Sequence, residues 1–173
     1  MPELITHYAV SLLISSRVLS LKYAVLLALV GLLPDIDALF RIHRWFTHSI
    51  IIASLAFLTV YIVALKLKPK TPKLVITAYV LYSAHIILDI FTAPTPIIWP
   101  LTLMSYMFKV GIDGIISADG VAITQNIKLD TTPADFTQRL MIEGPIISET
   151  SLTTAVAVAT AIVVERLMQK HTR

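Results

Sequence analysis

Residues 74–92 read LVITAYVLYSAHIILDIFT, a run with the length and apolar character of a membrane-crossing helix that is interrupted by His85 and Asp89. These two residues are four positions apart, so they share one face of the helix and could bind one ion together. Ionisable side chains among apolar helices are costly to desolvate, and they are usually kept where they pair, bind a metal or take part in chemistry. The segment therefore predicts both a membrane-embedded helix and a functional site.

The composition of the whole chain favours the same fold class. Of its 173 residues, 56% are hydrophobic and 14% are charged, against about 25% charged residues in typical soluble domains, and the mean hydropathy is +0.79. We predict an all-α polytopic membrane protein. The formal net charge of +3 is too small to indicate nucleic-acid binding, and a chain without cysteines has neither disulfides nor a thiolate zinc site.

Further apolar runs predict the other membrane helices. Residues 46–65 and 146–164 are each about as long as a bilayer span. Two shorter runs, 4–16 and 23–33, lie on either side of a polar break and predict a helical hairpin that Pro34 ends, since proline disfavours helix in the residue before it. We expect about five membrane helices, two of them short.

The chain divides into three predicted regions. Residues 1–104 form a helical membrane core with the metal site, 105–145 form a small extramembrane α/β insertion, and 146–173 form a C-terminal membrane helix with a basic tail. Within the core, the proline-rich stretch 94–108 predicts an interfacial or re-entrant segment rather than a span.

The predicted insertion combines turn, strand and helix signals. Asp113-Gly114 and Asp119-Gly120 are hairpin-turn dipeptides, and residues 120–129 have strand-like content. Residues 132–135 (TPAD) resemble a helix start, with threonine as N-cap, proline at the first helical position and an acid in the first turn. We expect that helix to end at Gly144-Pro145.

The distribution of basic residues predicts the topology. Cytoplasmic turns of membrane proteins are enriched in lysine and arginine. If each helix crosses once, the lysine-rich turn between the two long helices and the basic C-terminus fall on the same side, which places the C-terminus in the cytoplasm of an inner or plasma membrane protein. The basic residues on that side are Arg17, Lys22, Lys66, Lys68, Lys70, Lys73, Arg166, Lys170 and Arg173.

The same topology brings the histidines and aspartates together near the outer face. Five separate segments reach that level, and a ligand set of imidazole and carboxylate without thiolate suits zinc, manganese or iron. Asp35 and Asp37 lie at alternate positions by a helix end, so one could ligate while the other orients a histidine or bridges a second ion. The candidate ligands are His7, Asp35, Asp37, His43, His48, His85 and Asp89.

Two further features lie beside these candidates. His48 begins the next helix, with Thr47 or Ser49 as a possible cap, and Arg44 offers a planar guanidinium that suits a phosphate. Each piece also has a simpler interpretation, since an isolated histidine such as His85 is more often a satisfied buried side chain than a ligand. Serine-hydrolase chemistry is disfavoured because neighbours on a helix do not face each other as nucleophile and base must.

At these residues the chain resembles the YdjM-like inner-membrane proteins, a family regarded as metal-dependent hydrolases. The resemblance covers roughly residues 1–104, and no motif is recognised in 105–173. The matching residues are Thr6-His7, Leu33-Pro34-Asp35-Ile36-Asp37, His43-Arg44, Thr47-His48-Ser49, His85 with Asp89, and Trp99-Pro100.

The order of ligands is also similar to that of zinc-dependent phospholipases C and the related single-strand nucleases. That likeness implies that Asp35, His48, His85 and Asp89 hold one ion and that His7 contributes to a second. The chain departs from the pattern because no further histidine pair follows Asp89, so a three-ion cluster is not expected.

These observations predict hydrolysis of a phosphoester in a membrane lipid or lipid-linked substrate. One or two divalent ions, zinc first among them, would activate water. His7, Asp37 or His43 would complete a second site or act as general base, and Arg44 would hold the phosphate. Two other classes stay open, namely a divalent metal-ion transporter and a non-enzymatic scaffold whose metal ties the helices together. The oligomeric state is left open.

Overall fold

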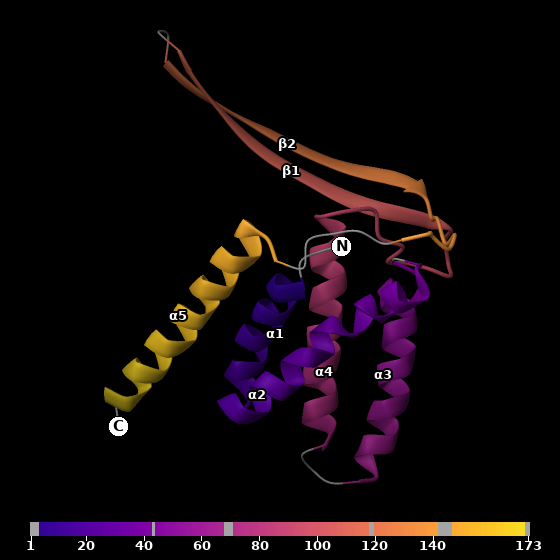
Figure 1. Cartoon of the computed structure of the whole chain (residues 1–173), viewed down its shortest axis with the longest axis vertical. Coiled ribbons are helices and arrows are strands. Elements are labelled where there is room, and N and C mark those ends of the chain that lie inside the picture. Colours follow the sequence, from indigo (N-terminus) through magenta and orange to yellow (C-terminus); the bar gives the residue numbers. More distant parts are fainter. Residues whose placement is uncertain (1–3, 43, 68–70, 118–119, 142–146, 172–173) are drawn as a thin grey trace.

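The structure, a computed structural model, describes residues 4–42, 44–67, 71–117, 120–141 and 147–171. It is mostly helical, with one long two-stranded ribbon beside the helices (Figure 1). The elements in chain order are α1 (Leu4–Val18), α2 (Leu21–Ala28), the 3-10 helices η1 (Leu29–Phe40) and η2 (Phe46–His48), α3 (Ile50–Leu65), α4 (Thr71–Ile90), β1 (Met104–Ser117), β2 (Gly120–Pro133) and α5 (Glu149–His171).

Helix length supports fewer membrane spans than the sequence suggested. Three described helices are long and apolar enough to cross a bilayer, namely Leu21–Phe40, Thr71–Ile90 and Glu149–Gln169. Leu4–Val18 and Ile50–Leu65 are apolar but shorter. The prediction of about five spans is therefore overstated on this criterion.

Pro34 does not end its helix, contrary to the prediction. The chain continues through it as a 3-10 helix to Phe40, and Arg41 follows with a left-handed backbone, φ 58°. The φ angle that proline fixes is compatible with 3-10 geometry. The 3-10 winding begins at Leu29 and continues past Pro34, and this places Asp35 and Asp37 inside the helix rather than after it.

The helices bury small and polar side chains and expose large apolar ones. Leu55 and Leu58 on α3 are 59% and 54% exposed, whereas Ser15, His48 and Asp89 are fully buried. A soluble domain would show the reverse pattern. An apolar exterior around a small polar interior fits helices that face lipid.

The helices are connected through α1 and α4. A small apolar core of Ala9, Val158 and Ile162 joins α1 to α5, while α4 packs against α3, η1 and α1. The Arg17 guanidinium also forms an ion pair with Glu165, on α5. Because α4 contacts most of the N-terminal half, its polar residues lie where several elements meet.

The two strands form one continuous antiparallel ribbon, so the predicted turn at Asp113-Gly114 is wrong. Pairing runs from Met104 opposite Pro133 to Ser117 opposite Gly120, with Asp113 opposite Thr124. Alternation of apolar residues continues through Asp113-Gly114, which keeps the strand extended. The chain reverses between Ser117 and Gly120, and Asp119 of the second predicted turn lies outside the described residues.

The helix predicted to start at residues 132–135 is absent from the described residues that follow. Residues 134–141 are irregular, and Gly144-Pro145 lies outside the described chain. Asp135 accepts hydrogen bonds from the backbone N–H and hydroxyl of Thr137, which lower its pKa. The backbone N–H of Arg139 donates to Arg41 O at 2.9 Å. These contacts give the polar groups partners without a helix.

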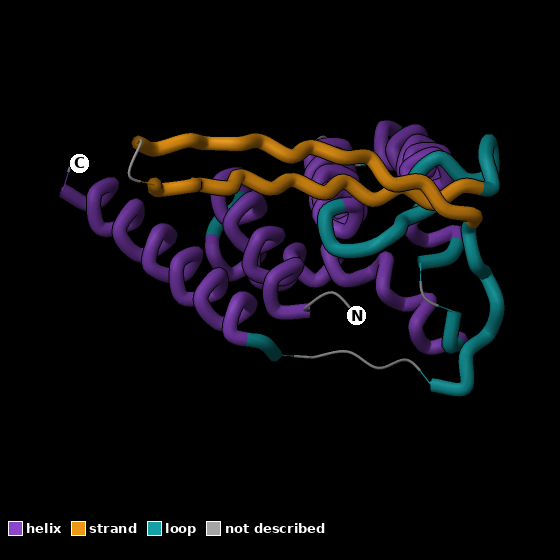
Figure 2. The backbone as a smooth tube through the Cα atoms, turned by 90° about the horizontal axis from the view of Figure 1, so that it is seen from above, coloured by secondary structure: helices purple, strands orange, loops and turns teal. Residues whose placement is uncertain are grey.

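The ribbon lies across one end of the helices (Figures 1 and 2). The segment between α4 and β1 pairs with the start of β1, since Thr95 and Tyr106 form two backbone hydrogen bonds of 2.9 Å. Residues 104–108 of the predicted interfacial segment belong to β1. The lysines that end α3 and begin α4 lie at the opposite end of the helices, as does the C-terminus (Figure 1).

Candidate metal centre

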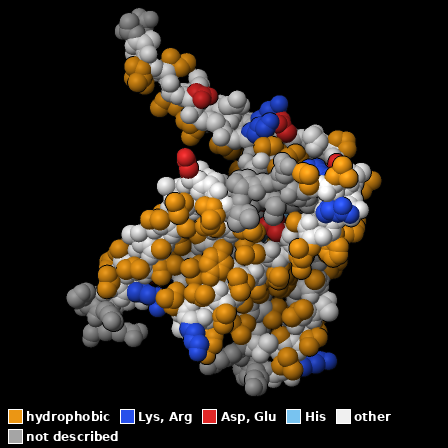
Figure 3. All heavy atoms as spheres, viewed as in Figure 1, with side chains coloured by type: hydrophobic (Ala, Val, Ile, Leu, Met, Phe, Trp, Pro, Cys, Tyr) orange, Lys and Arg blue, Asp and Glu red, His pale blue; other side chains and the backbone are white. Residues whose placement is uncertain are grey.

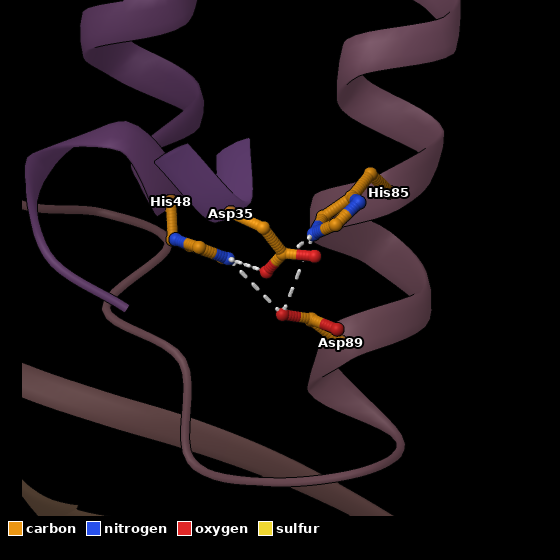
Figure 4. Close-up of side chains that lie close together, drawn as sticks. All are labelled: Asp35, His48, His85 and Asp89. Carbon is orange, nitrogen blue, oxygen red and sulfur yellow. Dashed lines mark ion pairs between the residues drawn. The ribbon is translucent and has the colours of Figure 1, made fainter. Parts of the chain in front are cut away.

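Four of the predicted ligands converge at the ribbon end of the helices. Asp35 comes from η1, His48 from η2, and His85 and Asp89 from successive turns of α4 (Figure 4). One ligand atom from each lies within 4.8 Å of all the others, and all four residues are buried. The set could hold a metal ion.

The spacing of these atoms suits a single small cation. His48 Nε2 lies 3.7 Å from Asp35 Oδ1 and 3.2 Å from Asp89 Oδ2. His85 Nε2 lies 3.5 and 3.7 Å from the same two oxygens. Ligands about 2.0 Å from a tetrahedral zinc ion are about 3.3 Å apart, so these four histidine–aspartate distances are close to those around such an ion.

The excess of buried negative charge at the site also favours binding of a cation. Asp35, Asp37 and Asp89 are buried together, and Arg44 forms an ion pair with Asp89. With neutral imidazoles, three carboxylates and one guanidinium leave an excess of negative charge. In addition, neither oxygen of Asp35 receives a hydrogen bond from the described residues. Buried charges of this kind are costly unless they are paired or coordinate a metal.

The backbone of η1 orients His85. Its Nδ1 lies 2.7 Å from the carbonyl oxygen of Gly31; because a carbonyl can only accept, Nδ1 carries the hydrogen and Nε2 keeps its lone pair. Gly31 also allows η1 to pack closely against α1, since a Cβ at that position would lie 1.9 Å from Ser11 Oγ on α1. A side chain there would separate η1 from α1.

Asp37 orients His48 in the same way. Its Oδ2 lies 3.0 Å from His48 Nδ1 and accepts hydrogen bonds from the Trp45 backbone N–H and the Thr47 hydroxyl, both 2.8 Å. The carboxylate thus directs His48 Nε2 toward the other ligands. The Tyr82 hydroxyl donates to Thr47 O at 2.6 Å and ties this turn to α4.

His7 lies against the cluster rather than in it. Its ring stacks on that of His85 with centroids 3.8 Å apart, and its Nε2 lies 3.2 Å from Asp89 Oδ1. Its Nδ1 has no hydrogen-bond partner among the described residues. His7 therefore contacts the other oxygen of a candidate ligand and keeps one ring nitrogen available.

Arg44 connects the cluster to a cavity. Its Nε donates to Asp89 Oδ2 at 2.9 Å and its Nη2 donates to Thr92 Oγ1 at 3.1 Å, and its backbone is left-handed, φ 60°. The guanidinium also lines a cavity of about 330 Å³ between the end of α4 and the base of the ribbon. The other lining residues are Ala93, Pro94, Ser105, Thr132, Pro133, Asp135 and Arg139.

The structure brings most of the predicted site residues together, and they make different contacts. Asp37 and His7 contact ligands, Arg44 contacts Asp89, and His43 lies outside the described residues. Ser49 caps α3, accepting from the Ile52 backbone N–H at 3.3 Å. Sequence reasoning missed Gly31 and Arg139. A glycine inside an apolar helix was a weak sign of close packing for Gly31, but no local pattern marks Arg139.

Fold and site together define a class: a helical protein with candidate membrane spans and a buried histidine–aspartate group able to hold a metal ion. The model of the YdjM inner membrane protein family matches residues 1–171. The chain belongs to this family. The match includes the ribbon and α5, so the family extends beyond the 1–104 region in which the resemblance was recognised. The chain matches no curated protein and no solved structure at a significant level.

Proposed function

We propose that this protein is a membrane-bound, metal-dependent hydrolase that cleaves a phosphoester in a membrane lipid or lipid-linked substrate. One observation carries the proposal: Asp35, His48, His85 and Asp89 place one ligand atom each within 4.8 Å in a buried, negatively charged site. Two imidazoles with two carboxylates suit zinc, and also manganese or iron. Bound there, the ion would lower the pKa of a water molecule and polarise the phosphoester.

In this proposal each residue around the four ligands has a distinct role. Asp37 and Gly31 O hold the tautomers of His48 and His85, so that both Nε2 atoms face the ion. His7 donates through Nε2 to Asp89 and would accept the proton of the attacking water at Nδ1. Asp37 is occupied in positioning His48, so we assign it no proton transfer.

The cavity beside Arg44 suits the phosphate group of the substrate. Arg44 and Arg139 both line it, Ser105 and Thr132 add hydroxyl groups, and the Asp135 carboxylate lies 3.9 Å from Arg139 Nη2. Two donors of Arg44 are already fixed by Asp89 and Thr92, which holds the planar guanidinium in one orientation. A phosphate held there would lie directly beside a metal ligand.

The proposed membrane orientation follows from the two ends of the helices. The ligands and the ribbon share one end, while the turn between α3 and α4 and the C-terminal end of α5 lie toward the other (Figure 1). Lys66 directly follows α3, Lys73 lies in the first turn of α4, and Arg166 belongs to the last turns of α5. By the positive-inside rule the basic end and the C-terminus are cytoplasmic, and the metal centre is near the outer face. Lipid headgroups are then the substrate groups nearest to the cavity. Nothing in this arrangement favours nucleic acid.

One observation favours a second candidate, a metal-stabilised scaffold without activity. Four protein ligands can saturate a tetrahedral ion, and structural zinc sites are closed in this way. Transport is less well supported, because the described ligands gather at one end of the helices and are not spread along a path.

Metal analysis of the detergent-purified protein tests the proposal first. We expect about one equivalent of zinc, manganese or iron per chain by elemental mass spectrometry, lost in both Asp35→Ala and His85→Ala because each removes a ligand. Ser83→Ala is the matched control: Ser83 is buried on α4 two residues before His85 and is not among the four ligands. Absence of metal from the wild type after reconstitution would contradict the proposal.

Activity then separates the hydrolase from the scaffold. The loaded protein is incubated with a chromogenic phosphodiester and with phospholipid in mixed micelles. A hydrolase should lose turnover in His7→Gln while keeping its metal, and should bind substrate more weakly in Arg139→Ala. Metal without turnover, together with a cobalt absorption spectrum unchanged by phosphate, would assign the scaffold instead.

A further inference from the structure

The β1–β2 ribbon has one apolar and one polar face. Residues directly opposite each other in an antiparallel pair lie on the same side, so the register assigns each pair to a face. Apolar pairs on one face include Phe108–Leu129, Val110–Ile127 and Ile116–Val121, with Ile112 and Ile123 between them. The other face has Lys109–Lys128, Gly111–Asn126 and Asp113–Thr124, and its apolar exceptions are Met107, Ile115 and Ala122.

The apolar face has almost no protein cover. Ile112, Ile116 and Ile123 are 71%, 86% and 70% exposed, and Val110 and Ile127 are more than half exposed. Contiguous exposed apolar surface of this kind marks a site of association. The ribbon therefore presents a surface that water would solvate poorly along most of its length.

The apolar face is turned toward the helices. Phe108, which belongs to it, contacts Phe91 just after α4, with ring centroids 6.0 Å apart. Figure 3 shows hydrophobic side chains along the edge of the ribbon nearer the helices. The apolar surface of the ribbon thus continues the exposed apolar surface of the helical body.

The polar face has groups that need water. Lys109 Nζ and Lys128 Nζ lie 2.7 and 3.0 Å from the two oxygens of Asp130, and both lysines are more than half exposed. Their hydrogen bonds lower the pKa of the Asp130 carboxyl. The ribbon is therefore suited to a boundary between an apolar and an aqueous phase.

The backbone of the ribbon excludes a transmembrane position. The described sheet has only two strands, so each strand has one edge without a neighbour. Unpaired backbone N–H and C=O groups are too costly in the hydrocarbon core, where no water can satisfy them. At the headgroup level the same edges remain hydrated.

We infer that residues 104–133 lie on the surface of the same membrane that holds the helices, with the Val110–Ile127 face in the boundary between headgroups and acyl chains. The occupant of the apolar face is thus the lipid bilayer. The orientation of that face toward the helical body, in a chain of an inner membrane protein family, favours lipid over a second copy of the chain. This inference is independent of the metal centre and of the proposed function.

Single cysteines test the inference in a chain that has none of its own. Ile123→Cys and Thr124→Cys are neighbours on β2 that face opposite sides of the ribbon, and Leu58→Cys on α3 is a lipid-facing reference. Each is labelled with an environment-sensitive fluorophore and reconstituted in phosphatidylethanolamine–phosphatidylglycerol vesicles. We expect a blue shift and quenching by spin-labelled lipid at Ile123→Cys, and neither at Thr124→Cys.

Two results would overturn the inference. Equal quenching by an aqueous quencher at both positions would show that the apolar face does not meet lipid. Protection of Ile123→Cys from aqueous and lipid quenchers alike, together with a disulfide between chains, would assign the face to a second copy. A circular dichroism spectrum and a thermal unfolding midpoint equal to those of the wild type check the folding of each variant, and gel filtration identifies dimers before labelling.

Discussion

Asp37 acts on the candidate metal centre through His48. Its carboxylate lies 3.0 Å from His48 Nδ1 and also accepts from Trp45 and Thr47, so it fixes both the tautomer and the direction of the imidazole. Such partners of metal ligands are worth about 10–100-fold in metal affinity. Asp37 is thus a positioning residue.

We expect Asp37→Asn to weaken metal binding by about 10–100-fold without changing the stoichiometry at saturation. The neutral amide keeps the size of the side chain but supports the imidazole less well. Competition with a fluorescent chelator in detergent gives the affinity, and the exposed ribbon residue Asp113→Asn serves as the control. Loss of half or more of the sites at saturating metal would show instead that Asp37 is itself a ligand.

At the level of single residues, sequence predicted the chemistry better than the geometry. The cost of placing His85 and Asp89 in an apolar helix marked them as a site, and the structure buries both beside Asp35 and His48. The sequence did not reveal that Asp37 contacts His48, because Asp35 and Asp37 lie at alternate positions by a helix end and either could be the metal ligand. That distinction depends on the turn at Trp45, which the tertiary fold sets.

Among the elements, η1 packs closely against α1. Gly31 leaves no room for a side chain, since Ser11 Oγ would lie 1.9 Å from its Cβ and Ser11 Cβ would lie 2.8 Å away. The same residue presents its carbonyl to His85. Helix packing and ligand orientation are therefore linked at one position.

Gly31→Ala should destabilise the protein by about 1–3 kcal/mol, the usual cost of overpacking, and should weaken metal binding because the Gly31 carbonyl moves away from His85. Thermal unfolding and metal titration in detergent measure the two effects. Gly111→Ala is the control, since a Cβ there would meet nothing nearer than 3.9 Å. The double variant Gly31→Ala/Ser11→Gly removes the obstruction and should recover most of both losses; no recovery would argue against this packing.

The elements themselves were predicted unevenly. Apolar runs located α3, α4 and α5 well, because their length and hydropathy are strong local signals. Pro34 was misleading, since it lies within a 3-10 helix that runs from Leu29 to Phe40 and does not end there. The prediction of a turn at Asp113-Gly114 was wrong because the pairing of apolar residues on one face of the ribbon outweighs a local turn preference. Residues 134–141 are held by tertiary contacts that no short pattern encodes.

For the molecule as a whole, the metal should contribute to stability. The ligands come from η1, η2 and α4, so an ion ties together segments that are distant in the chain. Removing it with a chelator should lower the free energy of unfolding by about 2.7 kcal/mol when free metal had been 100 times its Kd. Thermal scans followed by Trp45 and Trp99 fluorescence measure the change. His85→Ala should show no chelator effect, and an equal shift in both proteins would place the effect elsewhere.

The separation of the ligands along the chain also bears on biogenesis. During synthesis Asp35 and His48 leave the ribosome before His85 and Asp89, so in the proposed membrane protein the first carboxylate would enter the membrane without its later partners. An aspartate at the centre of a span adds roughly 2.5–3.5 kcal/mol to the free energy of insertion. Asp35 instead lies near the end of the Leu21–Phe40 helix, and Asp89 in the last turn of α4. Under the proposed function, each helix could then be integrated singly, and metal loading would be a maturation step that waits for α4.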